Sequence, residues 1–301
     1  MGGMKIGFIG FGEVGSIFSR AMEKNGAKIL VYDTLLHSGK GEEIINDRVQ
    51  GGESTICSTI EELVTNSDYI VATVTTQSAR TVANEAVKYL IPGQTYIDLN
   101  STSPQVKVEL AEIISSSGAD FVEGAILGAV GATGVDTQLL TAGEKGKEVT
   151  GLLNQLGLNA SFYSTEIGKA AVFKMLRGIF SKGLEALLLE VLVAGKKASI
   201  DKDLWQDIAR FMTDNPFEVV ASNWIKSHAL AYERRYWEVT QIVETMKELG
   251  VDPIMASATE TLFKRSLSLG LSDAFSHKPD SYEEVVDYIW KKLEGETLDH
   301  Q

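Results

Sequence analysis

Short apolar runs alternate with amphipathic stretches through the first half of the chain. Runs of about five apolar or β-branched residues bounded by glycine or polar residues predict buried strands, and apolar residues at helical spacing predict helices. The predicted strands are Lys5–Ile9, Lys28–Tyr32, Tyr69–Val74, Thr95–Leu99, Phe121–Ile126, Gln138–Thr141 and Ser161–Tyr163. The predicted helices are Val14–Asn25, Ser78–Leu90, Pro104–Ser116 and Lys147–Leu156, while Gly39–Cys57 is ambiguous. This alternation is typical of a doubly wound α/β domain with a mostly parallel sheet.

From Gly168 onward the strand pattern stops and long helical periodicity begins. One apolar face is formed by Phe173, Leu176, Phe180, Leu184, Leu187, Leu188 and Val191. Further helices are predicted at Lys202–Asp214, Phe217–Glu248, Pro253–Ser268 and Tyr282–Leu293. We therefore expect an α/β domain over residues 1–165 and an all-α domain over residues 166–301. Because Glu185–Lys196 is apolar on nearly every side, we expect a homodimer formed through the helical domain.

The amino-acid composition limits which kinds of partner and ligand the protein is expected to bind. The formal net charge of -13 argues against a nucleic-acid partner, so a small-molecule substrate is the better expectation. The single cysteine, Cys57, excludes an internal disulfide and a metal site built from several thiolates, and we expect it to be a packing residue. We predict no metal. The chain has no apolar stretch of about 20 residues and its start does not resemble a signal peptide, so we expect a cytoplasmic protein without membrane contact.

A glycine-rich segment follows the first predicted strand and opens the first predicted helix. It reads Gly10-Phe11-Gly12-Glu13-Val14-Gly15, which fits the Gly-x-Gly-x-x-Gly fingerprint of a Rossmann dinucleotide-binding domain. Gly10 permits the tight turn, Gly12 lets the backbone approach a diphosphate, and Gly15 lets helix and strand pack closely. We expect all six residues to form the cofactor-binding turn, with the free N–H groups of the helix facing the phosphates.

Asp33 ends the second predicted strand, where a carboxylate can bind the adenosine ribose hydroxyls and repel a 2′-phosphate. NAD is therefore favoured over NADP, although His37 and Lys40 follow closely and could offset that repulsion. Thr75 and Thr76 follow another strand and are predicted to contact the cofactor. A helix cap made by Thr76 or Ser78 is an equal alternative.

Three motifs, taken together, carry a resemblance to a known family. They are Gly7-Phe8-Ile9-Gly10-Phe11-Gly12-Glu13-Val14-Gly15, Asp98-Leu99-Asn100-Ser101-Thr102-Ser103-Pro104 and Gly168-Lys169-Ala170-Ala171-Val172-Phe173-Lys174-Met175. In this order they resemble the β-hydroxyacid dehydrogenase superfamily, which includes 3-hydroxyisobutyrate and 6-phosphogluconate dehydrogenases. The resemblance implies an NAD(P)-dependent enzyme that transfers hydride to or from a hydroxy acid or related alcohol or carbonyl substrate. It also implies that Lys174 is the catalytic lysine.

The second and third motifs place polar groups where a substrate can bind. Asn100, Ser101 and Thr102 lie between a strand and a helix and can hold a carboxylate or carbonyl group, with Asn100 also near the cofactor. Helix capping by Ser103 is the alternative. Lys174 begins a polar stripe on an otherwise apolar helix, continued by Arg177, Gly178, Ser181 and Glu185. A lysine there can exchange the proton that accompanies hydride transfer, whereas a solvated lysine is the simpler alternative.

Two segments depart from the family pattern. In Glu123-Gly124-Ala125-Ile126-Leu127-Gly128-Ala129, Gly128 is retained as a substrate-binding residue but Leu127 replaces a serine, which favours an apolar or bulkier substrate. Arg177-Gly178 replaces an Asn-Asn pair, and Arg177 could bind an anionic or carbonyl-bearing substrate. The helical half looks closer to a less characterised 6-phosphogluconate-dehydrogenase-like branch whose C-terminal domain has no assigned function. There His228, Arg234 and Arg235 are expected either to enter the cleft or the partner subunit, or to lie on an exposed helix face.

Two other functions fit the same motifs. An imine or cyclic-amine reductase has a similar fold but commonly uses Asp or Tyr as its proton donor. A sensor without turnover would bind the dinucleotide and transfer no hydride. The polar pair Lys174 and Arg177 argues against the sensor, and a Lys174 turned away from the nicotinamide would favour the imine reductase.

Overall fold

The computed structural model describes residues 3–298. The chain divides into two compact units, Met1–Ile179 and Phe180–Gln301, each described here by itself. The sequence predicts a boundary near residue 165, where the strand pattern stops. The helix α8 (Lys169–Lys197) begins just after that point and contains the division between the units.

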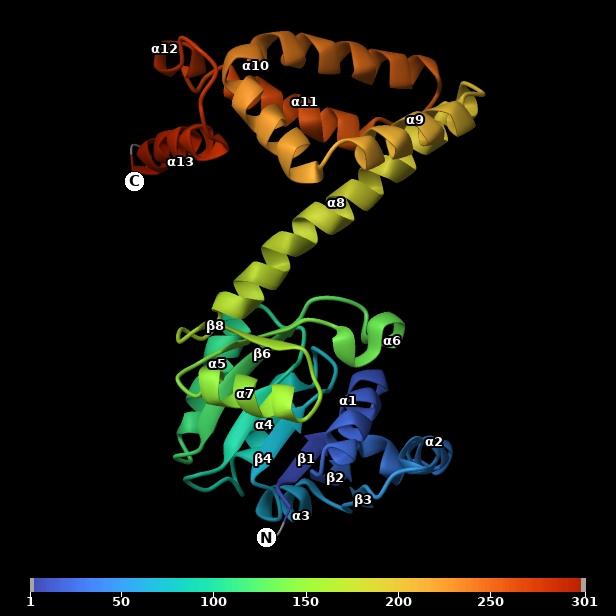
Figure 1. The fold of residues 1–301 in the computed structure, drawn as a ribbon, viewed down its shortest axis with the longest axis vertical. Helices are drawn as coiled ribbons and strands as arrows, with labels where there is room; N and C mark the ends of the chain where they lie inside the picture. Colours follow the sequence, from blue (N-terminus) through green and yellow to red (C-terminus); the bar gives the residue numbers. More distant parts are fainter. Residues whose placement is uncertain (1–2, 299–301) are drawn as a thin grey trace. The chain divides into compact units, whose positions relative to one another are not determined.

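The first unit contains one eight-stranded sheet (Figure 1). Its strands are β1 (Lys5–Ile9), β2 (Lys28–Tyr32), β3 (Thr55–Ile56), β4 (Tyr69–Ala72), β5 (Thr95–Asp98), β6 (Asp120–Ile126), β7 (Leu139–Ala142) and β8 (Ala160–Ser164). Their order is β3-β2-β1-β4-β5-β6-β7-β8, and all neighbours are parallel except β6 and β7. The predicted Rossmann class with a mostly parallel sheet is confirmed.

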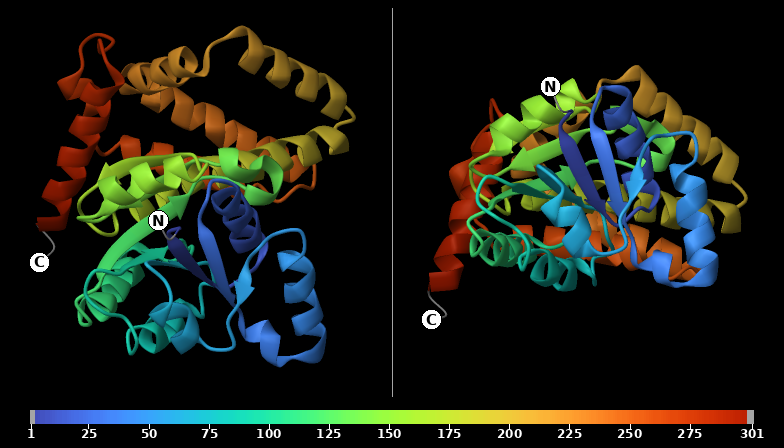
Figure 2. Two further views of the ribbon diagram at one scale, coloured as in Figure 1. Left: turned by 60° about the horizontal axis from the view of Figure 1, so that its bottom comes forward. Right: turned by 90° about the horizontal axis from the view of Figure 1, so that it is seen from below.

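Helices lie on both faces of this sheet (Figure 2). Side chains alternate along each strand, so the core is divided between the two faces. Val71 and Ile97 face a cluster that includes side chains from α1 (Glu13–Lys24) and α7 (Gly146–Gln155). The adjacent Ile70 and Tyr96 face the opposite cluster. Its helices are α3 (Ile60–Thr65), α4 (Ala79–Ala86) and α5 (Pro104–Ser115).

Several elements differ from the sequence prediction. The ambiguous segment contains α2 (Gly39–Val49) and β3, preceded by the 3-10 helix η1 (Thr34–His37), and α3 was not predicted. Strand β4 ends at Ala72 rather than at Val74, because Thr73 and Val74 turn to pack against Gly10. After β6 come the short helices α6 (Val130–Thr133) and η2 (Gly134–Asp136).

The second unit is all-α among its described residues, as predicted. Besides the end of α8 it contains α9 (Asp201–Asp214), α10 (Phe217–Glu248), α11 (Ile254–Ser266), α12 (Leu271–Ala274) and α13 (Tyr282–Leu298). Val239 and Val243 of α10 pack against Ala256 of α11. Across residues 3–298, no helix combines the length and the apolar character that crossing a membrane requires.

Candidate active site

The turn between β1 and α1 requires its glycines. Gly10 has φ +89°, and a Cβ there would lie 2.6 Å from the carbonyl oxygen of Thr73. A Cβ on Gly15 would lie 2.7 Å from the carbonyl oxygen of Gly10. These distances are too short for any side chain, so both glycines are needed to pack the turn against β4 and α1.

Gly12 differs because it faces open space. Among residues 3–298, no atom lies within 4 Å of the position that a Cβ on Gly12 would take. Gly12 lines a cavity of about 340 Å³ at the carboxyl ends of β1, β2 and β4, together with Gly10, Asp33, Arg48 and Thr75. Helix α1 begins next to it at Glu13, so its first N–H groups lie at this cavity. A bare glycine beside a helix N-terminus fits a diphosphate, and a cavity lined by both apolar and polar side chains fits an adenosine.

Asp33 is held by the backbone on both of its oxygens. Oδ2 accepts a hydrogen bond of 2.7 Å from Phe11 N, and Oδ1 accepts one of 2.9 Å from Leu35 N. Arg48 Nη1 donates to the carbonyl oxygen of Phe11 at 2.7 Å. Asp33 and Arg48 therefore bind the backbone N–H and the backbone carbonyl of Phe11, respectively. Arg48 was missed by sequence reasoning because it lies in the ambiguous segment.

The other predicted cofactor residues lie around this cavity in different ways. Phe11 is buried, Val14 packs against the core, and the Glu13 carboxylate lies against Gly131 of α6. Thr75 lines the cavity and its hydroxyl lies 2.9 Å from that of Ser78. The Ser78 side chain makes no capping hydrogen bond to α4, so the alternative prediction of a helix cap by the Ser78 side chain is wrong.

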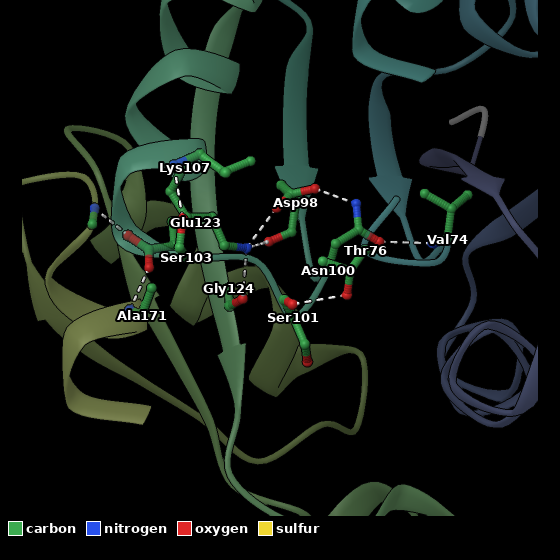
Figure 3. A network of polar contacts seen from close by, with 12 residues as sticks. Val74, Thr76, Asp98, Asn100, Ser101, Ser103, Lys107, Glu123, Gly124 and Ala171 are labelled. Carbon is green, nitrogen blue, oxygen red and sulfur yellow. Dashed lines mark hydrogen bonds and ion pairs between the residues drawn. The ribbon is translucent and has the colours of Figure 1, made fainter. Parts of the chain in front are cut away.

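The loop between β5 and α5 forms a second polar group at the same edge of the sheet (Figure 3). Asn100 is buried. Its Oδ1 accepts a hydrogen bond of 2.7 Å from Val74 N, and its Nδ2 donates one of 2.5 Å to Asp98 Oδ1. Thr76 Oγ1 donates to the carbonyl oxygen of Ser101 at 2.9 Å, so the loops after β4 and β5 are tied together. The loop carrying Ser101 is therefore held from two sides.

Lys174 meets this loop from α8. Its Nζ donates a hydrogen bond of 2.5 Å to Ser101 Oγ, across 73 residues of sequence. One turn further along α8, Arg177 Nη1 lies 3.5 Å from the carbonyl oxygen of Leu127, beside the exposed Gly128. The structure thus brings Ser101, Gly128, Lys174 and Arg177 to one edge of the first unit.

Thr102 lies deeper than its neighbours. Its side chain is 2% exposed, and its Oγ1 has no hydrogen-bond partner among residues 3–298. Ser103 caps α5, since its Oγ accepts a hydrogen bond from Val106 N. The predicted capping role of Ser103 therefore holds in the same loop that presents Ser101.

A buried ionic group supports the site and was not found from sequence. Lys107 Nζ lies 2.5 Å from Asp98 Oδ2, with side chains 1% and 0% exposed. Glu123 of β6 is also fully buried and accepts hydrogen bonds from Gly168 N and Ala171 N, both at 2.5 Å. Burial raises the pKa of the Glu123 carboxyl, while the Lys107 ammonium and these two N–H groups act in the opposite direction.

The other residues singled out in the sequence make contacts within their own units. In the second unit, His228 Nε2 lies 2.9 Å from Ser266 Oγ, and burial lowers the pKa of the His228 imidazole. Arg235 donates to the Trp224 carbonyl oxygen at 2.9 Å, whereas Arg234 forms an exposed ion pair with Glu238. In the first unit, Cys57 is buried, and burial raises the pKa of its thiol to about 11, as expected of a packing residue.

The parallel sheet, the glycine turn and the adjoining cavity define a dinucleotide-binding protein of the Rossmann class. The chain belongs to the family described as the NAD binding domain of 6-phosphogluconate dehydrogenase, whose model matches residues 5–163. Residues 196–266 match a domain of unknown function, DUF1932. The predicted resemblance to the 6-phosphogluconate-dehydrogenase-like branch is confirmed, and the cofactor class is a nicotinamide dinucleotide.

Two relatives are similar over most of their length. An uncharacterized 28.5 kDa protein of Methanothermus fervidus is 30% identical over 262 residues, which cover 87% of this chain and 98% of that protein. Glyoxylate/succinic semialdehyde reductase 1 of Arabidopsis thaliana is 26% identical over 283 residues, which cover 90% and 95%. The family thus supports an NAD(P)-dependent oxidoreductase of the hydroxyacid dehydrogenase and reductase type.

Among solved structures, an imine reductase from Myxococcus stipitatus in complex with NADP+ has a TM-score of 0.75. Sequence identity is 17%, and the match covers 95% of this chain and 99% of that one. At this identity the likeness concerns the fold alone.

Proposed function

We propose that the protein transfers hydride between a nicotinamide dinucleotide and a hydroxy acid, or a related alcohol or carbonyl compound, with Lys174 as the general acid or base. The observation that carries this proposal is the 2.5 Å hydrogen bond from Lys174 Nζ to Ser101 Oγ, at the sheet edge where the dinucleotide turn also lies. Ligands of open α/β sheets bind outside the carboxyl ends of the strands.

The residues around the glycine turn would hold the cofactor. Gly10, Gly12 and the first N–H groups of α1 would hold the diphosphate, and Asp33 would face the adenosine ribose, which favours NAD. When bound, the nicotinamide supplies or accepts the hydride. The chain fits this group because the space beside Gly12 is open and the adjoining cavity combines apolar side chains with the polar Asp33, Arg48 and Thr75.

Lys174 and Ser101 would handle the proton. In the reducing direction Lys174 Nζ gives a proton to the substrate carbonyl oxygen, and in the oxidising direction it removes the proton from the hydroxyl. Its hydrogen bond to Ser101 fixes the direction of the amine. The Arg177 guanidinium and the backbone at Gly128 would bind a substrate carboxylate, and Asn100 would hold the loop in place, which their contacts with Leu127 and Val74 support.

The test compares Lys174→Ala with Lys182→Ala, which removes an exposed lysine from the same helix. Glyoxylate, succinic semialdehyde, hydroxy acids and cyclic imines are assayed with both nicotinamide cofactors in each redox state. We expect Lys174→Ala to keep its dinucleotide affinity and to lose at least about a hundredfold in kcat. Unchanged turnover would remove Lys174 from the mechanism. Turnover of imines alone would favour an imine reductase, and dinucleotide binding without any turnover would favour a sensor.

We also propose a homodimer. Large apolar side chains of α8 are exposed in the single chain, including Ile179 at 69%, Leu176 at 61% and Leu189 at 61%. Apolar surface of this extent is typical of a protein–protein interface. Sedimentation at micromolar concentration should give a dimer, and Leu189→Glu should weaken it. A monomer at high concentration contradicts the proposal.

A further inference from the structure

The carboxylate of Glu123 joins the centre of the sheet to the start of α8. Glu123 lies on β6 and is fully buried. Its two oxygens accept hydrogen bonds from Gly168 N and Ala171 N, which are 45 and 48 residues away along the chain (Figure 3). Each carboxylate oxygen of Glu123 therefore accepts a hydrogen bond from one backbone N–H at the start of α8.

Helix α8 needs an acceptor from elsewhere at this end. The first N–H groups of a helix have no partner within the helix, and a side chain just before the helix commonly accepts from them. That position in α8 is Gly168, which has no side chain and has φ +94°. Glu123 supplies the missing acceptor, and its charge is favourable at a helix N-terminus. Glu190 does the same for α11, accepting from Met255 N and Ala256 N.

The position of Lys174 follows from where α8 begins. Lys174 is three residues beyond Ala171, so the two lie on the same side of the helix about one turn apart. Ser101, its partner, is fixed independently by Thr76. The 2.5 Å contact between Lys174 and Ser101 thus depends on two anchors, and Glu123 is the one on the lysine side. Shifts of about 1 Å at a reacting group can lower turnover a hundredfold.

We infer that Glu123 is a positioning residue for Lys174, acting by fixing the first turn of α8. This inference rests on the proposed function. The charged groups around Glu123 are Lys107 of α5 and Asp98 of β5. Lys107 is paired with Asp98, and its ammonium and the two N–H groups at the start of α8 all favour the ionised carboxylate of Glu123.

The activity test is a double-mutant cycle. Glu123→Gln keeps the shape of the side chain but leaves only one acceptor oxygen for two N–H groups. We expect kcat to fall at least about tenfold with dinucleotide affinity unchanged. In the Lys174→Ala background the same change should have no further effect. Glu190→Gln removes a comparable helix cap and should keep wild-type kcat. An unchanged kcat in Glu123→Gln, or a full additional loss in the Lys174→Ala background, would overturn the inference.

A second readout does not depend on turnover. Peptide mass spectrometry measures how fast Lys174 reacts with acetic anhydride, with Lys182 as the internal reference, and how fast the amides of residues 168–177 exchange with deuterium. We expect both rates to change in Glu123→Gln and not in Glu190→Gln. Unchanged rates overturn the positioning role even if Lys174 is catalytic. A fully active Lys174→Ala, by contrast, contradicts the proposed function. The labelling rates would then still test whether Glu123 positions Lys174.

Discussion

Lys107 and Asp98 form an ion pair inside the dinucleotide-binding unit, with 2.5 Å between Nζ and Oδ2 and almost no exposure of either side chain. Lys107 Nζ also donates to the carbonyl oxygens of Asp98 and Gly124, at 3.0 Å and 3.4 Å. The other oxygen of Asp98 accepts from Asn100 Nδ2. The pair therefore connects α5 to β5 and β6, and through Asn100 it contacts the loop that carries Ser101.

Removing the cation should destabilise the fold strongly. Lys107→Ala leaves the Asp98 carboxylate buried without its partner, and we expect the free energy of unfolding to fall by about 3–5 kcal/mol. Urea unfolding followed by circular dichroism measures this change. Lys88→Ala is the control, because Lys88 pairs with Glu85 in the exposed part of the same unit and its loss should leave the midpoint unchanged. Equal midpoints for Lys107→Ala and wild type would mean that the buried pair adds nothing to stability.

The parts of this molecule that sequence could predict depend on local patterns. The strand Lys5–Ile9 is bounded as predicted because its apolar run ends at the glycine turn. The roles of Gly10 and Gly15 follow from one spacing rule, and the structure shows the close contacts that the rule implies. Lys174 was identified by a family motif, and its contact with Ser101 joins two motifs that were recognised separately.

The parts that sequence could not predict depend on contacts between distant segments. Lys107 lies on a helix whose other charges are exposed, and nothing nearby in the sequence shows that it turns inward to Asp98. Glu123 reads as one polar residue in a strand, and its partners are 45 and 48 residues away. Arg48 likewise contacts Phe11 across 37 residues. Because such pairs have no fixed spacing, only the folded chain identifies them.

Two glycines of the same turn should respond differently to one added methyl group. Gly12→Ala places its Cβ in open space, so stability should be unchanged. Dinucleotide affinity should fall at least about tenfold, because the methyl group would occupy the space proposed for the diphosphate. Gly15→Ala places its Cβ 2.7 Å from the Gly10 carbonyl oxygen, so it should lower the melting temperature.

Titration calorimetry and thermal unfolding on both variants test this contrast. The reading of the turn fails if Gly12→Ala binds the dinucleotide as tightly as wild type, or if Gly15→Ala melts at the wild-type temperature.

Cofactor preference should depend on the charge of Asp33. Asp33→Asn removes the negative charge that would oppose a 2′-phosphate but keeps one oxygen to accept from Phe11 N or Leu35 N. We expect the ratio of the NADP+ and NAD+ dissociation constants to fall about tenfold. Asp47→Asn, at an exposed position on α2, controls for the change in net charge. If the ratio of dissociation constants is unchanged, residues other than Asp33 determine the preference between NAD and NADP. Arg48 would be the first of these to test, because it lines the same cavity.

The pH dependence of stability should carry a signature of Glu123. Burial raises the pKa of this carboxyl in the folded state, so its contribution to stability is fully present below the pKa of the unfolded chain and is lost as pH rises through the folded-state pKa. The free energy of unfolding of wild type minus that of Glu123→Gln should therefore decrease as the pH rises above the ordinary pKa of a glutamate. Glu112→Gln, which alters an exposed carboxyl on α5, corrects for the loss of one charge. If the difference instead grows with pH, the hydrogen bonds from Gly168 and Ala171 outweigh burial. The carboxylate would then be a net stabilising group in the ionised form.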